Sequence, residues 1–257
     1  MTDTATEQRD LARFRQQYYG LLARLLSREP PDDLLDALRP GIAERAAAAR
    51  LLDPLLGEGW DHLAGVLPEI TAEIAEQEFL RLFIGPFQPE VTPYESWYIT
   101  GQLFQGPLIA LRRFVSQIGL ERLEAVYPEP EDALAFELEV MNWLVTRQLE
   151  ANSPEEEQEW LHRQAAFLRH HLLIWALHCA QDLESAKSAV LYKGVGLLLR
   201  GLASFEKQRL RAEGVPDCET LEQARRRYGA PRAFQGPLFD PSAPPKPPGT
   251  PPSGEGS

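Results

Sequence analysis

The sequence predicts an all-α protein, and three observations support this fold class. Apolar residues recur at spacings of three and four along most of the chain, which is the period of an amphipathic helix. Sustained alternation with a period of two is absent, as are Asn-Gly and Asp-Gly hairpin turns. Prolines and glycines fall between the periodic segments, where they end helices. We therefore expect one helical-bundle domain of about nine to eleven helices over residues 8–230.

The first half of the chain is expected to fold into four or five helices. The first carries Leu11, Phe14 and Tyr18 on one face and ends before Pro30-Pro31. Apolar patterns predict further helices over 32–38, 42–56 and 60–83, the last with a boundary at Pro68.

Two capping boxes mark helix starts in the second half. Thr92 is the expected N-cap in Thr92–Glu95, and Ser153 is the expected N-cap in Ser153–Glu156. The other expected helices cover residues 106–118, 132–149, 156–183, 185–213 and 220–228, with Gly119 ending the first of them.

Composition limits the classes of partner. The net charge of -12 and the sequence pI of about 5.0 argue against binding to nucleic acid or to an anionic membrane, and favour basic partners. Two cysteines form no CxxC motif, and the N-terminus has no secretory pattern, so a cytoplasmic location is expected. Residues 1–7 are expected to be frayed. Residues 231–257 are expected to be a disordered Pro-rich tail, because residues 237–257 contain eight prolines.

The stretch Glu78–Tyr98 gathers large apolar side chains around a proline-rich loop. Phe79, Leu82 and Phe83 form one helical stripe, and Tyr94 follows the loop. The loop prolines lower the entropy cost of holding such a surface ready for a peptide. The alternative interpretation is that these residues form a core helix, a turn and a second core helix.

Carboxylates in the segment 129–139 form a second group of candidate residues. Glu137 falls within the apolar arc of its predicted helix, where a carboxylate needs a partner or a groove. A buried salt bridge to Arg81 or Arg113 is the structural alternative. Asp132 lies near a helix N-terminus, where the helix dipole favours a carboxylate whatever its function. If both face a groove, they suit a peptide that contains arginine.

Evidence for catalysis is sparse. The histidines and Cys179 between His162 and Asp182 make a metal site conceivable, but HExxH, CxxC and G-x-S-x-G motifs are absent. Gly194 and Gly196 lack the third glycine of a dinucleotide fingerprint. We expect no catalysis, no metal and no cofactor.

Four blocks of the sequence resemble the TorD/DmsD/NarJ-type redox enzyme maturation chaperones. The stretch EFLRLFIGPFQPEVTPYESWY is similar to the family segment E-x-x-R-L-F-x-G-P…P-Y-E-S-x-Y. Three further blocks follow in the family's order, at 106–120, 129–141 and 167–175. The resemblance covers roughly residues 75–205.

The resemblance implies an all-helical chaperone without catalytic activity. Such proteins bind the twin-arginine signal peptide and the immature catalytic subunit of a molybdopterin-dependent oxidoreductase, aid cofactor insertion and delay export. They are cytoplasmic monomers or domain-swapped dimers. The family's leader-binding surface maps onto Phe79, Leu82, Phe83, Pro93, Tyr94, Glu95, Ser96 and Asp132. Where the family usually has histidine after that aspartate, this chain has Ala133, so no role of that histidine is carried over.

The residues themselves agree with this implication in kind. A twin-arginine leader carries two guanidinium groups followed by an apolar stretch, so an acidic protein with a Phe/Leu/Tyr groove complements it. We expect Phe79, Leu82, Phe83 and Tyr94 to contact the apolar stretch, with Asp132, Glu137 or Glu95 near the arginines. Two alternatives stay open: a metal-dependent helical-bundle hydrolase that uses His162–Asp182, and a helical adaptor without leader specificity.

Overall fold

The computed structural model describes residues 2–86, 88–123 and 127–229, and the regular structure in these ranges is helical, as expected. Twelve α-helices are described, against the expected nine to eleven: α1 (Thr2–Ser27), α2 (Asp32–Leu38), α3 (Ile42–Arg50), α4 (Pro54–Val66), α5 (Ala72–Phe79), α6 (Glu95–Thr100), α7 (Gly106–Gln117), α8 (Leu134–Leu149), α9 (Pro154–His170), α10 (Leu172–Ser185), α11 (Leu191–Ala212) and α12 (Leu221–Tyr228). The predicted Pro-rich tail, 231–257, lies outside the described residues.

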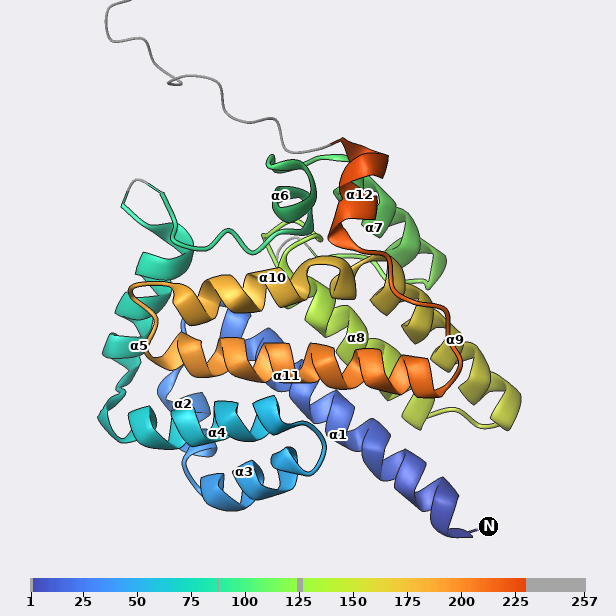
Figure 1. Cartoon of the computed structure of the whole chain (residues 1–257), viewed down its shortest axis with the longest axis horizontal. Helices are drawn as coiled ribbons and strands as arrows, with labels where there is room; N and C mark the ends of the chain where they lie inside the picture. The colour runs from blue at the N-terminus through green and yellow to red at the C-terminus, as the bar shows by residue number, and fades with distance from the viewer. Residues whose placement is uncertain (1, 87, 124–126, 230–257) are drawn as a thin grey trace, which may run out of the picture.

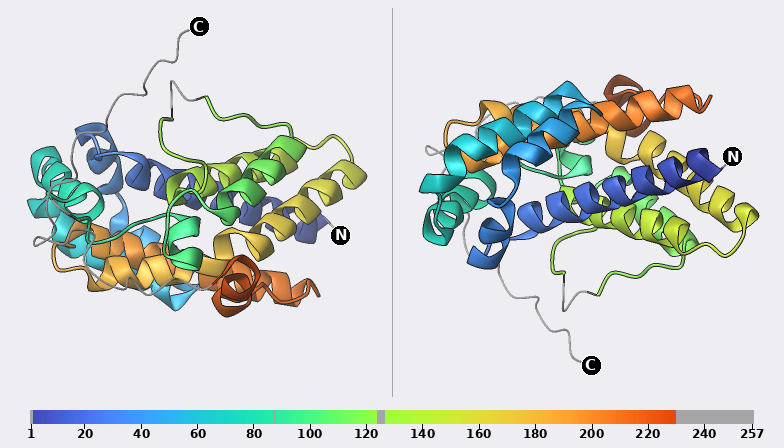
Figure 2. Two further views of the ribbon diagram at one scale, coloured as in Figure 1. Left: turned by 90° about the horizontal axis from the view of Figure 1, so that it is seen from above. Right: turned by 90° about the horizontal axis from the view of Figure 1, so that it is seen from below.

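The longer helices pack in two layers. Helices α4, α11 and α10 lie side by side in one layer, and α1 pairs with α8 in the other (Figure 1, Figure 2). Helix α9 packs against both α8 and α10, and α3 covers α4. Helix α5 packs against α11 at one end of the first layer, while α6, α7 and α12 gather near α10 (Figure 1). One hydrophobic core runs between the layers and draws residues from all twelve helices.

Glycines allow α4 and α11 to approach closely. A Cβ atom on Gly59 would lie 2.7 Å from the Cδ2 atom of Leu198, and one on Gly201 would lie 2.7 Å from the backbone nitrogen of Leu56. Neither position leaves space for a larger side chain, because real Cβ atoms do not approach heavy atoms this closely. Gly194 faces Leu63 in the same interface, whereas Gly196 faces Ala180 and Leu183 of α10, so both glycines have a packing role.

Several predicted helix boundaries are confirmed. Helix α4 ends at Val66, and a 3-10 turn over Leu67–Glu69 contains Pro68. Gly119 follows α7 with a φ of 77°, as expected for a glycine that ends a helix. Ser153 is the N-cap of α9, and its side chain accepts a hydrogen bond from the N–H of Glu156.

Other boundaries differ from the prediction. The expected helix 156–183 breaks at His171, whose φ of -135° and ψ of -94° separate α9 from α10. The expected helix 42–56 breaks before Asp53, which caps α4 by accepting a hydrogen bond from the N–H of Leu55. Helix α1 is described from Thr2. The break at His171 has neither proline nor glycine, so the usual signals of a helix end did not reveal it. The break before α4 does carry such a signal, because Pro54 follows the Asp53 cap in the first turn of α4.

A buried ionic network joins the two layers. Glu206 of α11 accepts hydrogen bonds from Arg15 and Tyr19 of α1, at 2.6 Å and 2.8 Å, and from Arg209 at 2.8 Å. The Arg15 and Glu206 side chains are almost fully buried. None of the helices in the described part of the chain combines the length and apolar character needed to cross a lipid bilayer.

Candidate functional site

Two segments that lie about forty residues apart in the sequence pair directly, and this pairing builds the candidate site. Tyr94 and Ala133 form an isolated antiparallel bridge. The N–H of Leu134 donates to the carbonyl of Pro93 at 2.9 Å, and the N–H of Glu95 donates to the carbonyl of Asp132 at 2.8 Å. This pairing explains why α8 begins at Leu134 rather than at residue 132, as the sequence had indicated.

The capping box predicted at Thr92 is wrong. Helix α6 begins at Glu95 with Tyr94 as its N-cap, and Tyr94 makes no side-chain cap. The Asp132 carboxylate instead accepts a hydrogen bond from the N–H of Ser96 at 3.1 Å. A carboxylate from a distant segment therefore satisfies a free donor at the start of α6, where the helix dipole also favours negative charge. The local pattern failed because its cap is supplied by tertiary structure.

A pocket of about 220 Å³ lies beside this pairing, and we call it the Tyr94 pocket. It is lined by side chains from four regions of the chain. The first two are the end of α1 with the residues after it, Leu26–Glu29, and the end of α5 with the following π-helical turn, Phe79, Phe83 and Ile84. The other two are the segment before α6, Pro93 and Tyr94, and the segment that leads into α8, Tyr127, Glu129 and Ala133–Ala135. The structure thus brings together four residues that the sequence selected: Phe79, Phe83, Pro93 and Tyr94.

Aromatic stacking fixes one wall of the Tyr94 pocket. The ring centroids of Phe79 and Phe83 lie 4.9 Å apart, and Phe83 meets Tyr192 of α11 edge-on at 5.2 Å. Phe79 is mostly buried, and Phe83 is half-buried, so Phe83 offers the larger accessible face. Leu82 is fully buried in the core and does not line the pocket. In this conformation its role is packing.

Tyr94 gives the pocket a polar edge. Its hydroxyl donates to the Glu129 carboxylate at 2.6 Å. Burial raises the pKa of Tyr94, and the neighbouring Glu129 and Asp132 carboxylates raise it further. The same causes, burial and then Glu129, raise the pKa of Tyr127 on the opposite side. The Glu129 carboxylate at this edge is a group with which a cation can pair.

The remaining predicted carboxylates are buried and do not line the pocket. Glu95, Asp132 and Glu137 are each no more than 1% exposed, as is Ser96. Glu95 faces the Nδ1 atom of His171 at 3.2 Å, which holds the junction between α9 and α10 against α6.

Glu137 has a different partner from the arginines considered in the sequence. Its carboxylate accepts a hydrogen bond from the indole N–H of Trp175 at 3.1 Å, and Arg81 is exposed. Burial raises the pKa of Glu137 well above its usual range, and the Glu95 and Asp132 carboxylates raise it further. Glu137 is therefore a buried acid that favours the protonated form.

Glu78 opens the motif that contains Phe79 and Phe83, and its role was not recognised from the sequence. Its carboxylate accepts hydrogen bonds from the N–H groups of Val190, Leu191 and Tyr192, at 2.8 Å, 3.0 Å and 2.8 Å. These are free donors at the N-terminus of α11. Glu78 therefore locks α5 onto α11 and fixes the aromatic wall. No local pattern reveals a cap that reaches across 112 residues.

The histidine region does not assemble a metal site in the described residues. No group of three or more His, Cys, Asp and Glu side chains there is placed to hold a metal ion. His171 is buried against Glu95, His178 is exposed, and Asp182 accepts a hydrogen bond from the Tyr98 hydroxyl at 2.7 Å. The side chains proposed for a metal-dependent hydrolase thus face different surroundings, and burial raises the pKa of the Cys179 thiol to about 12.

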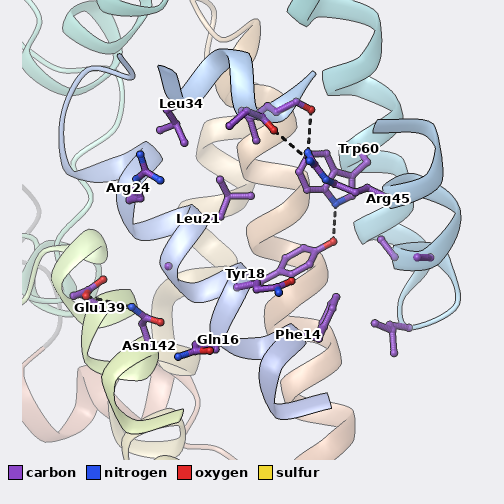
Figure 3. Close-up of a pocket in the computed structure, with 17 residues that line it drawn as sticks. Phe14, Gln16, Tyr18, Leu21, Arg24, Leu34, Arg45, Trp60, Glu139 and Asn142 are labelled. Atoms are coloured by element: carbon purple, nitrogen blue, oxygen red, sulfur yellow. Dashed lines mark hydrogen bonds between the residues drawn. The ribbon is translucent and has the colours of Figure 1, made fainter. Parts of the chain in front are cut away.

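A second and larger cavity, of about 690 Å³, was not found from the sequence, and we call it the α1–α4 cavity. It lies between α1, α2, α3 and α4, with Glu139 and Asn142 of α8 at one side (Figure 3). Its walls are lined by Phe14, Tyr18, Leu21, Leu34, Leu38, Leu52 and Trp60, among others. Each of these residues reads as an ordinary core position of an amphipathic helix, so no sequence pattern revealed the cavity.

Comparisons with known proteins agree with this architecture. A family model described as nitrate reductase delta subunit matches residues 49–181, which is just over half of the chain. This range contains the Tyr94 pocket except for its Leu26–Glu29 wall. Ala133, which departs from the family pattern, lines that pocket.

Curated relatives share identity over similar lengths. Chaperone protein TorD from Aeromonas salmonicida is 32% identical over 145 residues, which cover 56% of this chain and 58% of the relative. The probable Tat proofreading chaperone DmsD from Haemophilus influenzae is 29% identical over 124 residues, covering 48% and 55%. The perchlorate reductase assembly chaperone protein of Dechloromonas aromatica is 29% identical over 119 residues, covering 43% and 51%.

The chain thus spans between about half and three-fifths of the length of the curated relatives it matches. The region that the family model matches, residues 49–181, contains the motif blocks on which the resemblance was based. Because the family model covers more than half of the chain and the helical fold agrees with it, the protein belongs to the nitrate reductase delta subunit family, the family of the NarJ, TorD and DmsD chaperones.

Proposed function

We propose that the protein is a cytoplasmic redox enzyme maturation chaperone. In this proposal it binds the twin-arginine signal peptide and the immature catalytic subunit of a molybdopterin-dependent oxidoreductase, aids cofactor insertion and delays export. The relatives support the general class, since their names describe a TorD chaperone, a Tat proofreading chaperone and an assembly chaperone for perchlorate reductase. The protein acts by binding and catalyses no reaction.

One observation carries the leader-binding part of the proposal. The Tyr94 pocket joins an aromatic wall, Phe79 and Phe83, to a carboxylate, Glu129, at its edge. A twin-arginine leader offers apolar and guanidinium groups in close succession, and both find complementary partners here. Asp132 and Glu95 are buried where the two paired segments meet, and Asp132 holds them together by accepting a hydrogen bond from the N–H of Ser96. Glu137 is buried in its protonated form.

The experiment is capture of candidate reductase subunits by co-expression, followed by affinity measurement with the leader peptide alone. Phe83→Ala combined with Tyr94→Ala is expected to weaken leader binding by about 30-fold or more, as for aromatic contacts at the centre of an interface. The matched control is Leu80→Ala combined with Ile109→Ala. These side chains are 39% and 62% exposed and do not line the pocket, so affinity should stay unchanged.

Two outcomes would contradict the proposal, one for recognition of the leader and the other for the location of the binding surface. Capture of the subunit that is unaffected by deletion of its leader would leave a helical adaptor without leader specificity. Leader binding that survives the Phe83 and Tyr94 substitutions would place the binding surface elsewhere. Size-exclusion chromatography with light scattering would distinguish a monomer from a domain-swapped dimer, with and without the leader.

A further inference from the structure

The α1–α4 cavity has a well-fixed floor. The indole N–H of Trp60 donates to the Tyr18 hydroxyl at 2.6 Å, and the Arg45 guanidinium lies 5.2 Å from the Trp60 ring centre (Figure 3). The same guanidinium donates to the carbonyls of Leu38 and Ala37, at 3.0 Å and 3.2 Å. The Arg45 guanidinium thus contacts Trp60 with one face and the two carbonyls through its N–H groups. The floor presents apolar area, and these fixed partners hold the cavity open.

The α1–α4 cavity and the Tyr94 pocket are lined by different residues of the same two helices, α1 and α8. Helices α1 and α8 are antiparallel, since Gln16 bonds to Thr146 while Arg9 bonds to the carbonyl of Leu149. On α1 and just beyond it, the lining residues Gln17, Leu21, Arg24 and Arg28 are spaced by four, three and four positions, which places them on one face.

The partner helix repeats this arrangement. On α8, Ala135 lines the Tyr94 pocket, and Glu139 and Asn142 line the α1–α4 cavity, at spacings of four and three. The two hollows therefore follow one another along the same α1–α8 seam. Leu21 at the α1–α4 cavity and Arg28 at the Tyr94 pocket are seven positions apart, which corresponds to about 10 Å along a helix. An extended segment of about three residues spans that distance.

The chemistry changes along the seam. The Tyr94 pocket carries the carboxylates of Glu29 and Glu129 against one arginine, Arg28, with the buried Asp132 behind it. The α1–α4 cavity has a single carboxylate, Glu139, and a floor of aliphatic and aromatic side chains. Its own arginines are directed to other partners: Arg45 to Trp60, and Arg24 to Asp33 at 3.9 Å. One end thus suits cations, and the other suits apolar side chains.

We propose that the α1–α4 cavity receives the apolar stretch of the twin-arginine leader while the leader's two arginines lie at the Tyr94 pocket. This inference rests on the proposed function and adds a second contact region to it. The order of the two hollows matches the order of groups in the leader, in which the arginines precede the apolar stretch. A cavity of about 690 Å³ is in the range that encloses several side chains.

Two pairs of neighbouring residues allow a matched test. Leu52 and Ala48 line the α1–α4 cavity and are exposed, so glutamine at both positions removes apolar area at its rim without disturbing the core. Leu51 and Ala47 are also exposed and do not line it. Leu52→Gln with Ala48→Gln should weaken binding of the full leader about tenfold, and Leu51→Gln with Ala47→Gln should leave it unchanged.

Variants of the leader, combined with these substitutions in the protein, give a double-mutant cycle. When the apolar stretch of the leader is replaced by serine and glycine, the Leu52 and Ala48 substitutions should no longer change the affinity, since the contact they remove is already absent. When the two arginines are replaced by glutamine, the Leu52 and Ala48 substitutions should still weaken binding. The indole N–H resonance of Trp60, assigned with Trp60→Phe, should shift on addition of the full leader and not on addition of the apolar-stretch variant.

The outcomes separate this inference from the proposed function. Leader binding that is lost in Phe83→Ala with Tyr94→Ala but unaffected by Leu52→Gln with Ala48→Gln overturns the inference and leaves the proposed function standing. Failure of the unsubstituted protein to bind any leader overturns the proposed function first. A Trp60 shift that follows removal of residues 231–257, without a response to the leader, would assign the cavity to the chain's own C-terminal segment and overturn the inference.

Discussion

At the scale of single residues, Glu137 shows that the sequence can predict the burial of a side chain without predicting its hydrogen-bond partner. Helical periodicity placed this carboxylate within an apolar arc, and it is fully buried. Its partner, Trp175, comes from a helix that begins more than thirty residues later, so the sequence did not select it. The carboxylate also lies near Glu95 and Asp132, both of which disfavour its charge. The result is a group whose charge opposes folding.

This predicts that Glu137→Gln stabilises the protein as pH rises. The folded-state pKa of Glu137 lies above the unfolded value, so its contribution to stability is complete below the unfolded pKa and is lost as pH rises toward the folded pKa. Glutamine still accepts from Trp175 and cannot ionise. The gain should be near zero at about pH 4 and grow by about 1.4 kcal/mol for each pH unit between the two pKa values.

Urea denaturation at several pH values would measure this gain. Glu139→Gln is the control, because Glu139 is exposed on the same helix and should show no comparable trend. A Glu137→Gln variant that is destabilised equally at every pH would show that the buried carboxylate contributes to stability through something other than its proton.

At the scale of elements, the turn after α5 determines where the aromatic wall ends. The π-helical turn Leu80–Ile84 closes at Gly85, whose φ is 64°. The N–H of Gly85 donates to the carbonyl of Leu80 at 2.7 Å. This conformation is unfavourable for residues with a Cβ atom. A Cβ on Gly85 would also lie only 2.3 Å from the carbonyl oxygen of Gln88. Both the backbone conformation and the steric contact therefore disfavour alanine at this position.

We predict that Gly85→Ala costs about 2–4 kcal/mol in the free energy of unfolding, since it adds a steric clash to the backbone penalty. Gly119→Ala is the matched control: its φ of 77° is similar, but a Cβ there meets nothing within 4 Å. That substitution should cost only about 1–2 kcal/mol. Thermal unfolding of both variants would test the difference, and equal losses would show that the turn relaxes around the new methyl group.

At the scale of the whole molecule, the Arg15–Glu206–Arg209 network links the two layers. Burial alone would raise the pKa of Glu206, but Arg15 and Arg209 lower it to about 2. A carboxylate with a lowered pKa stabilises the fold above its unfolded pKa and loses that contribution as pH falls toward its folded pKa. The link between the layers is therefore expected to weaken between about pH 4 and pH 2.

Glu206→Gln is predicted to destabilise the protein by about 3–5 kcal/mol at pH 7, because it leaves two buried arginines without their carboxylate. The difference from the unsubstituted protein should shrink as pH falls below about 4. Glu213→Gln serves as the control, since Glu213 also pairs with Arg209 but is half-exposed and should cost less than about 1 kcal/mol. A loss of similar size at pH 3 and pH 7 would contradict an ionic origin.

Much of the fold was accessible from the sequence because helices are specified locally. Spacings of three and four residues predicted the all-helical class, and glycine, proline and Ser153 marked several true helix ends. The failures share a cause. Thr92 was not a cap because Asp132 supplies one from a distant segment, and the break at His171 accompanies its buried contact with Glu95. Competition between local and tertiary partners is not visible in a local pattern.

The sequence by itself determined the helical class, the family through its ordered motif blocks, and the aromatic residues Phe79, Phe83 and Tyr94 of the candidate site. Only the tertiary structure decided which of the predicted residues are accessible. It buried Leu82 and Glu137, paired Tyr94 with Ala133, and aligned a second cavity with the first along α1 and α8. The physical reason is range: a helix forms through contacts within four residues, whereas a pocket forms where helices distant in the chain meet.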